Sequence, residues 1–131
     1  MPQELTVFSL ASALARHANQ RQDVIAQNVA HADTPGYKAR DITPFSAVLE
    51  QGAGAQMSLA QTRPGHVPAF QEGAFRATEI NLPGAEAPNG NTVSLEDQML
   101  RSAQAKQNHD LALGVYSKAL DILRLSLGRR G

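Results

Sequence analysis

The sequence contains no cysteine and no tryptophan, and only 5% of its residues are aromatic. Without cysteine, neither a disulfide framework nor a thiolate metal site can form. With so few aromatic side chains, alanine and leucine must supply most of the packing. A length of 131 residues allows one domain at most, or a pair of helices with a small insert.

The chain also lacks an excess of charge of either sign. Twelve Lys and Arg residues balance twelve Asp and Glu residues, so nothing favours binding to nucleic acid or to anionic lipid. No segment approaches the run of about 18 apolar residues that a membrane span requires. The N-terminus has no basic region followed by an apolar core, so we expect no cleaved secretory signal.

No arrangement of residues points to catalysis. None of the four histidines forms an HxxxH or HxxE pair on one helical face, and a metal site needs three or more converging ligands. The sequence has no P-loop, no dinucleotide fingerprint and no Gly-x-Ser-x-Gly motif. We therefore expect no enzymatic activity, no cofactor and no metal.

Two long segments have helical periodicity. The first, residues 6–32, contains no glycine or proline and is rich in good helix formers. The second, residues 93–128, begins with Ser94 as a predicted N-cap. It would be roughly 50 Å long, whereas a globule of this size is only about 36 Å across. Either this helix kinks at Gly114 or the molecule is elongated, and the simplest elongated fold pairs the two helices as a hairpin.

Each predicted helix carries an apolar stripe whose residues alternate at spacings of four and three, which is the heptad pattern of helix–helix packing. We expect these stripes to form an assembly seam. Its residues are Leu14, Ile25 and Val29 in the first helix and Leu95, Met99, Leu113, Tyr116, Leu120, Leu123 and Leu127 in the second.

Other apolar residues of the second helix, such as Leu100, Leu111 and Ile122, lie off this stripe. Two helices bury one seam against each other, so these residues need a further partner. Neighbouring copies would supply it through a contact that does not close, which generates a helical tube. We expect the free chain to be partly disordered at both ends and to fold on assembly.

Residues 39–91 differ from both flanks, because they hold five of the seven prolines and six of the ten glycines. This composition predicts an irregular insert in which short strands are one option. The predicted fold class is mainly α: an elongated antiparallel pair of long terminal helices, coiled-coil-like, with this insert between them. The predicted divisions are 1–34, 35–91 and 92–131, of which the first and third together form an inner coiled-coil domain.

Proline 35 should end the first helix. It has no N–H and disfavours the α conformation at Thr34, so we expect the helix to stop near Ala32 or Asp33. Residues 34–37 then suit a type II turn, in which Pro35 supplies a φ near −65° and Gly36 the positive φ.

From Asn28 to Asp41 the chain reads NVAHADTPGYKARD. This stretch resembles the N-terminal motif of bacterial flagellar rod and hook proteins, and most of all that of the proximal rod members, with His31 where the motif usually carries a second Asn. Residues 62–67 (TRPGHV) and 91–99 (NTVSLEDQM) are also similar to this family. The motif and hinge residues are Asn28, Ala32, Asp33, Thr34, Pro35, Gly36 and Tyr37.

The resemblance implies a structural subunit of the proximal rod of the flagellar basal body. Such a subunit would assemble helically, transmit torque, enclose the export channel and be required for flagellum assembly and motility. The implied partners are other copies of the chain, other rod proteins, the basal-body ring adaptor and the flagellar type III export apparatus, with no nucleic acid and no membrane span. The implied location is the periplasmic rod, reached without a cleaved signal peptide.

Two alternatives stay open. The motif is shared among rod and hook proteins, so another short rod paralogue fits as well; the short length argues against the distal members. A soluble helical adaptor or membrane-surface helix is the other alternative, because Arg124, Arg129 and Arg130 lie close to leucines at the end of the second helix.

Overall fold

The computed structural model describes residues 2–50, 77–80 and 86–128. Most of them lie in two helices, α1 (Pro2–Ala30) and α3 (Leu95–Gly128), and in two short strands, β1 (Arg40–Ile42) and β2 (Ala77–Glu79). Residues 45–50 are also helical. The 62–67 segment, together with much of the predicted insert, lies outside the described residues.

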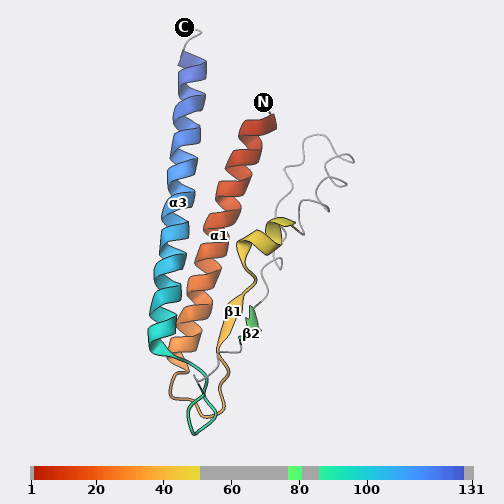
Figure 1. Cartoon of the computed structure of the whole chain (residues 1–131). Helices are drawn as coiled ribbons and strands as arrows, with labels where there is room; N and C mark the ends of the chain where they lie inside the picture. Colours follow the sequence, from red (N-terminus) through yellow and green to blue (C-terminus); the bar gives the residue numbers. More distant parts are fainter. Residues whose placement is uncertain (1, 51–76, 81–85, 129–131) are drawn as a thin grey trace.

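The two long helices run antiparallel and side by side, with the start of α1 and the end of α3 at one end of the pair and the turn after α1 and the loop before α3 at the other (Figure 1). Strand β1 and residues 45–50 run back alongside α1. This confirms the predicted mainly α fold built on paired terminal helices. Helix α3 passes Gly114 without interruption. Its 34 residues span about 51 Å, so the elongated molecule, and not the kinked helix, is the correct alternative.

The register between the helices is kept along their length. Near one end Asn28 contacts Gln98, and near the other Phe8 packs edge to face on Tyr116, with ring centroids 5.0 Å apart. Moving 20 residues back along α1 thus corresponds to moving 18 residues forward along α3. The two steps are nearly equal in length, as expected for an antiparallel pair without a slip, because both helices rise by the same amount per residue.

Small side chains fill the contact between the helices. Ala11 and Ala18 of α1 and Ala105 and Ala112 of α3 are all buried. The distance between packed helices depends on the side chains at the contact, and alanine allows a close approach. The larger apolar residues of α3 are consequently left on its other sides.

A small apolar core lies on the side of α1 that carries β1. It consists of Val24 of α1, Ile42 of β1 and Val48 of the helical stretch 45–50, with Phe45 packed against them. Strand β1 pairs antiparallel with β2, so that Ile42 is opposite Ala77. Short strands are one option predicted for the insert, and β1 and β2 are such strands.

The boundaries of the helices differ slightly from those predicted. Helix α1 ends at Ala30, two residues before the expected Ala32, and it extends further toward the N-terminus than residue 6. The turn that follows is as predicted: Gly36 has a φ of 75°, and the Tyr37 N–H donates to the Thr34 carbonyl oxygen at 3.3 Å. Ser94 caps α3, since its Oγ accepts from the Asp97 N–H at 3.4 Å.

Candidate assembly site

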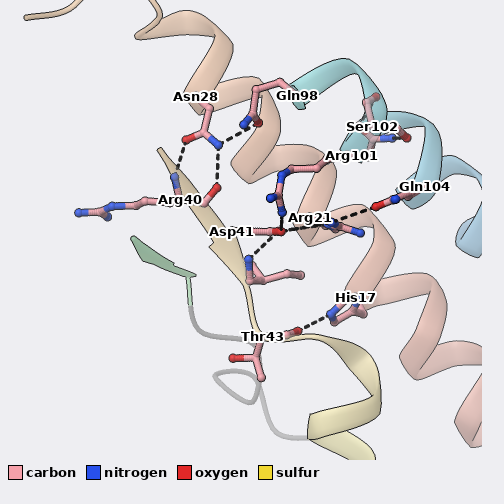
Figure 2. A network of polar contacts seen from close by, with 12 residues as sticks. His17, Arg21, Asn28, Arg40, Asp41, Thr43, Gln98, Arg101, Ser102 and Gln104 are labelled. Atoms are coloured by element: carbon pink, nitrogen blue, oxygen red, sulfur yellow. Dashed lines mark hydrogen bonds and ion pairs between the residues drawn. The ribbon is translucent and has the colours of Figure 1, made fainter. Parts of the chain in front are cut away.

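Asn28, near the end of α1, is the centre of a buried polar network (Figure 2). Its Nδ2 donates to the Arg40 carbonyl oxygen at 2.7 Å and to Gln98 Oε1 at 3.0 Å. Its Oδ1 accepts from the Arg40 N–H and from the Tyr37 hydroxyl, both at 3.1 Å. An amide side chain offers two donors and two lone pairs, so its full capacity is used to tie α1 to β1, to the turn and to α3.

Asp41 of β1 holds a second network beside the first (Figure 2). It is 8% exposed, and Arg21 of α1 binds both of its oxygens, at 3.1 and 3.2 Å. Arg101 of α3 binds Asp41 Oδ2 and also donates to Asp97 at 2.6 Å. Burial disfavours the charge on Arg101, but the hydrogen bond to Asp97 and the charge of Asp41 outweigh it and raise the pKa of the guanidinium. One carboxylate therefore links three elements through charge-assisted hydrogen bonds.

The turn after α1 is fixed by the loop before α3. The side-chain amide of Asn91 donates to the carbonyl oxygens of His31 and Thr34, at 2.9 and 2.7 Å. Gly36 and Gly90 both have positive φ, and a Cβ on Gly90 would lie 3.5 Å from the Gly36 Cα. The two loops thus pack backbone against backbone. We call this end of the molecule, residues 28–42 and 89–101, the joint.

His17 makes a further buried connection from α1. It is 3% exposed, its Nε2 lies 2.7 Å from the Thr43 carbonyl oxygen, and its ring packs edge to face on Phe45 at 5.5 Å. Burial is the main cause that lowers the pKa of His17, and the hydrogen bond to Thr43 only partly opposes it.

The predicted motif residues come together at the joint. Asn28 and Tyr37 lie in the buried network, and Thr34 and Gly36 form the turn. His31, at the position of the usual Asn, stacks on Tyr37 with ring centroids 4.7 Å apart. The other motif residues face outward to different degrees: Asp33 and Pro35 are exposed and Ala32 is half-buried.

The predicted assembly seam is divided by the structure. Within the chain, α3 contacts α1 through Gln98, Ala105 and Ala112, which lie beside the predicted stripe. The large side chains of that stripe therefore remain accessible, and Met99 is 73% exposed. Of the other seam residues, Ile25 is buried, Leu14, Leu120 and Leu123 are half-buried, and Val29, Leu95, Leu113, Tyr116 and Leu127 are exposed.

Beyond the joint, an open apolar groove of about 550 Å³ lies between the first turns of α1 and the C-terminal half of α3. Val7 of α1 lines one side of it. The residues of α3 that line it are Asp110, Leu111, Gly114, Val115, Lys118, Ala119 and Ile122.

Sequence reasoning missed the ionic part of the joint. Arg21 and Arg101 belong to neither the predicted motif nor the predicted assembly seam. Asp41 was included only as the last letter of the motif. A single Asp after a turn is an ordinary surface pattern, so only the approach of β1 to both helices reveals the ion pairs.

The residues that the structure describes contain neither a candidate metal site nor a candidate membrane span. Among residues 2–50, 77–80 and 86–128, no three His, Asp or Glu side chains gather as potential metal ligands. No helix in these same ranges is both long enough and apolar enough to cross a membrane.

Comparison with known proteins identifies a family and several relatives that this chain is similar to. Residues 9–38 match the family described as "Flagella basal body rod protein". The chain is 34% identical over 112 residues to the flagellar basal body rod protein FlgB of Agrobacterium fabrum, covering 83% of each chain. It is 33% identical over 104 residues to FlgB of Escherichia coli, covering 75% of each chain, and 32% identical over 111 residues to FlgB of Salmonella typhimurium.

A pair of long helices that exposes apolar side chains along its length is typical of a subunit that packs against other subunits. The chain belongs to the FlgB family of flagellar basal body rod proteins. This confirms the prediction of a structural subunit of the proximal rod with no catalytic role. It also places the chain in the flagellar basal body, among other rod proteins.

Proposed function

We propose that this chain assembles helically through its terminal helices, with copies of itself and with other rod proteins, to form a section of the rod wall. The observation that carries the proposal is the exposed apolar surface of α3. Leu95, Met99 and Leu113 are each more than half exposed. Apolar surface of this extent usually marks a contact with a partner.

In this arrangement the helix pairs form the inner layer of the tube, and residues 35–91 face outward. The wall transmits torque along the rod and encloses the export channel. The joint supports this role, because its networks on Asn28 and Asp41 hold both helices and β1 in one arrangement. A subunit that bent at the joint would transmit torque poorly.

The remaining partners follow from the family and from the position in the rod. We propose contacts with the basal-body ring adaptor and with the flagellar type III export apparatus. The export apparatus would deliver the chain to the periplasmic rod without cleavage of a signal peptide. Flagellum assembly and motility would then require this chain.

The experiment that tests assembly places charges on the exposed surface. The double variant Met99→Asp and Leu113→Asp changes side chains that are 73% and 53% exposed, so the fold of the chain itself should persist. We expect loss of swimming and loss of the chain from purified basal bodies, with unchanged helical content by circular dichroism. Gln107→Asp, an exposed polar position elsewhere on α3, is the matched control and should swim. Normal motility of the double variant would count against the proposal.

A further inference from the structure

Helix α3 has two apolar flanks that point in opposite directions. Residues two apart on a helix lie about 200° apart around its axis, and Leu111 and Leu113 are such a pair, as are Leu120 and Ile122. We call one flank the leucine row: Leu95, Met99, Leu113 and Leu120. The other flank carries the groove formed with Val7, which includes Leu111, Val115 and Ile122. Most of the surface between the two flanks that faces away from α1 is polar or small, with Glu96, Ala103, Gln107 and Asp121 exposed; Leu125, which is 69% exposed, is an apolar residue on it.

The groove is open and accessible to side chains of another molecule. Gly114 and Ala119 keep it open, and no atom lies within 4 Å of a Cβ placed on Gly114. Its lining is apolar apart from Asp110 and Lys118, and the long stem of Lys118 itself offers apolar surface while its ammonium reaches water.

We infer that the groove receives the leucine row of a second copy of this chain, aligned in the same direction. The inference rests on the proposed assembly and states which surface meets which. Leu113 and Leu120 are one heptad apart, about 10 Å along the axis, and the groove from Leu111 to Ile122 is about 16 Å long. Two projecting leucines therefore fit within the length of the groove.

The direction of the second copy follows from symmetry. In a wall where every α1 lies on the same side, turning a neighbour upside down exchanges its left and right flanks. Row would then face row, and groove would face groove. Only a neighbour aligned in the same direction brings row against groove, and such a heterologous contact can be repeated from copy to copy along a helical wall.

Because the chain contains no cysteine, disulfide formation can test the contact in the assembled rod. Full-length Leu113→Cys and Val115→Cys variants, carrying different epitope tags, would be expressed together in the same cells. We expect a disulfide between the two variants in purified basal bodies, and no disulfide when either variant is expressed alone. Dimers of Leu113→Cys with itself, or of Val115→Cys with itself, would overturn the inference because they require row-to-row or groove-to-groove contact.

A second variant fills the groove. A Cβ added at Gly114 would meet no atom of another segment within 4 Å, so Gly114→Leu should keep the fold while swimming and the mixed disulfide are lost. Gly128→Leu is the matched control, because Gly128 is also a helical glycine with no atom near its added Cβ and lies outside the groove. Normal swimming of Gly114→Leu would overturn the inference.

The outcomes separate this inference from the proposed function. Motile cells whose basal bodies hold both cysteine variants without a mixed disulfide would refute the row-to-groove contact alone. If the Leu113→Cys and Val115→Cys pair forms no disulfide in chains that keep Gly114, while Gly114→Leu still abolishes swimming, another protein occupies the groove and the second copy is the wrong occupant. The assembly role itself falls only if the Met99→Asp and Leu113→Asp double variant swims.

Discussion

At the scale of single residues, polar side chains and not large apolar ones fix the geometry of the joint. Asn28 uses every donor and acceptor of its amide on backbone and side-chain partners from three other segments. A buried polar group left without a partner costs about 1–3 kcal/mol, so any other arrangement of these segments is strongly disfavoured. The joint is therefore specified by a few side chains whose partners are far apart in the sequence.

His17 gives the molecule a predictable dependence on pH. Its pKa is lowered in the folded chain, mainly by burial, from an ordinary value of 6.5. As the pH falls below about 6.5, the unfolded chain takes up a proton more readily than the folded one, and the free energy of unfolding decreases. This loss amounts to at most about 1.4 kcal/mol per pH unit, until the pH also passes the lowered pKa. His17→Gln should remove it, as measured by urea unfolding between pH 7.5 and 5.

The control for this measurement is His31→Gln, which changes an exposed histidine. It should keep the pH dependence of the native chain. If the free energy of unfolding of His17→Gln changed with pH as much as that of the native chain, other groups would be responsible. The burial of His17 would then have no measurable effect on the pH dependence of stability.

The sequence predicts the role of a residue in the joint only where that role depends on neighbouring residues in the chain. The turn at Gly36 was predictable because Pro35 and Gly36 impose their own backbone angles. The family likeness covered both Asn28 and the 91–99 segment that contains Gln98, but it gave no indication that these two residues, 70 positions apart, are in contact. The contacts of Arg21 and Arg101 with Asp41 were not predictable, because a pairing between distant charged residues leaves no periodic trace in the chain.

At the scale of elements, the sequence predicted two long helices, but most of the predicted apolar stripe of α3 lies away from α1. Tyr116, which packs on Phe8, is an exception. The prediction followed the largest apolar residues, on the assumption that they fill the contact within the pair. The pair uses Ala105 and Ala112 instead, because small side chains permit close approach. A four–three stripe of leucines thus indicates a packing surface without saying whether the partner belongs to the same chain.

The turn between α1 and β1 can be tested at Gly36. A β-branched residue is poorly tolerated at its φ of 75°, so Gly36→Val should lower the free energy of unfolding by about 1–2 kcal/mol. A Cβ at this position would meet no atom within 4 Å, so the cost comes from the backbone and not from a clash. Chemical unfolding followed by circular dichroism measures it.

Gly36→Asn is the comparison that isolates the backbone term. Asparagine tolerates positive φ better than other residues with a Cβ, so this variant should lose clearly less stability than Gly36→Val. Equal losses in the two variants would mean that the positive φ of the turn does not determine its stability.

At the scale of the whole molecule, the two ends of the helix pair are stabilised very differently. The joint end has the networks of Asn28 and Asp41 and the core around Val24. At the open end, Phe8 packs on Tyr116, and leucines of α3 are exposed, with Leu125 69% exposed. A rod subunit built in this way would keep its shape at one end and depend on neighbours at the other.

This asymmetry predicts a gradient of hydrogen exchange in the free chain. Amides of residues 21–28 and 98–105 should exchange at least about tenfold more slowly than those of residues 113–128, since a local opening that costs 1.4 kcal/mol more is about tenfold rarer. In assembled rods the difference should disappear, because neighbouring copies would cover the leucine row and the groove. Uniform, strong protection along α3 in the free chain would show that the helix pair needs no neighbour to complete its packing. The exposed leucines would then have to be explained by a contact that binds an already rigid subunit.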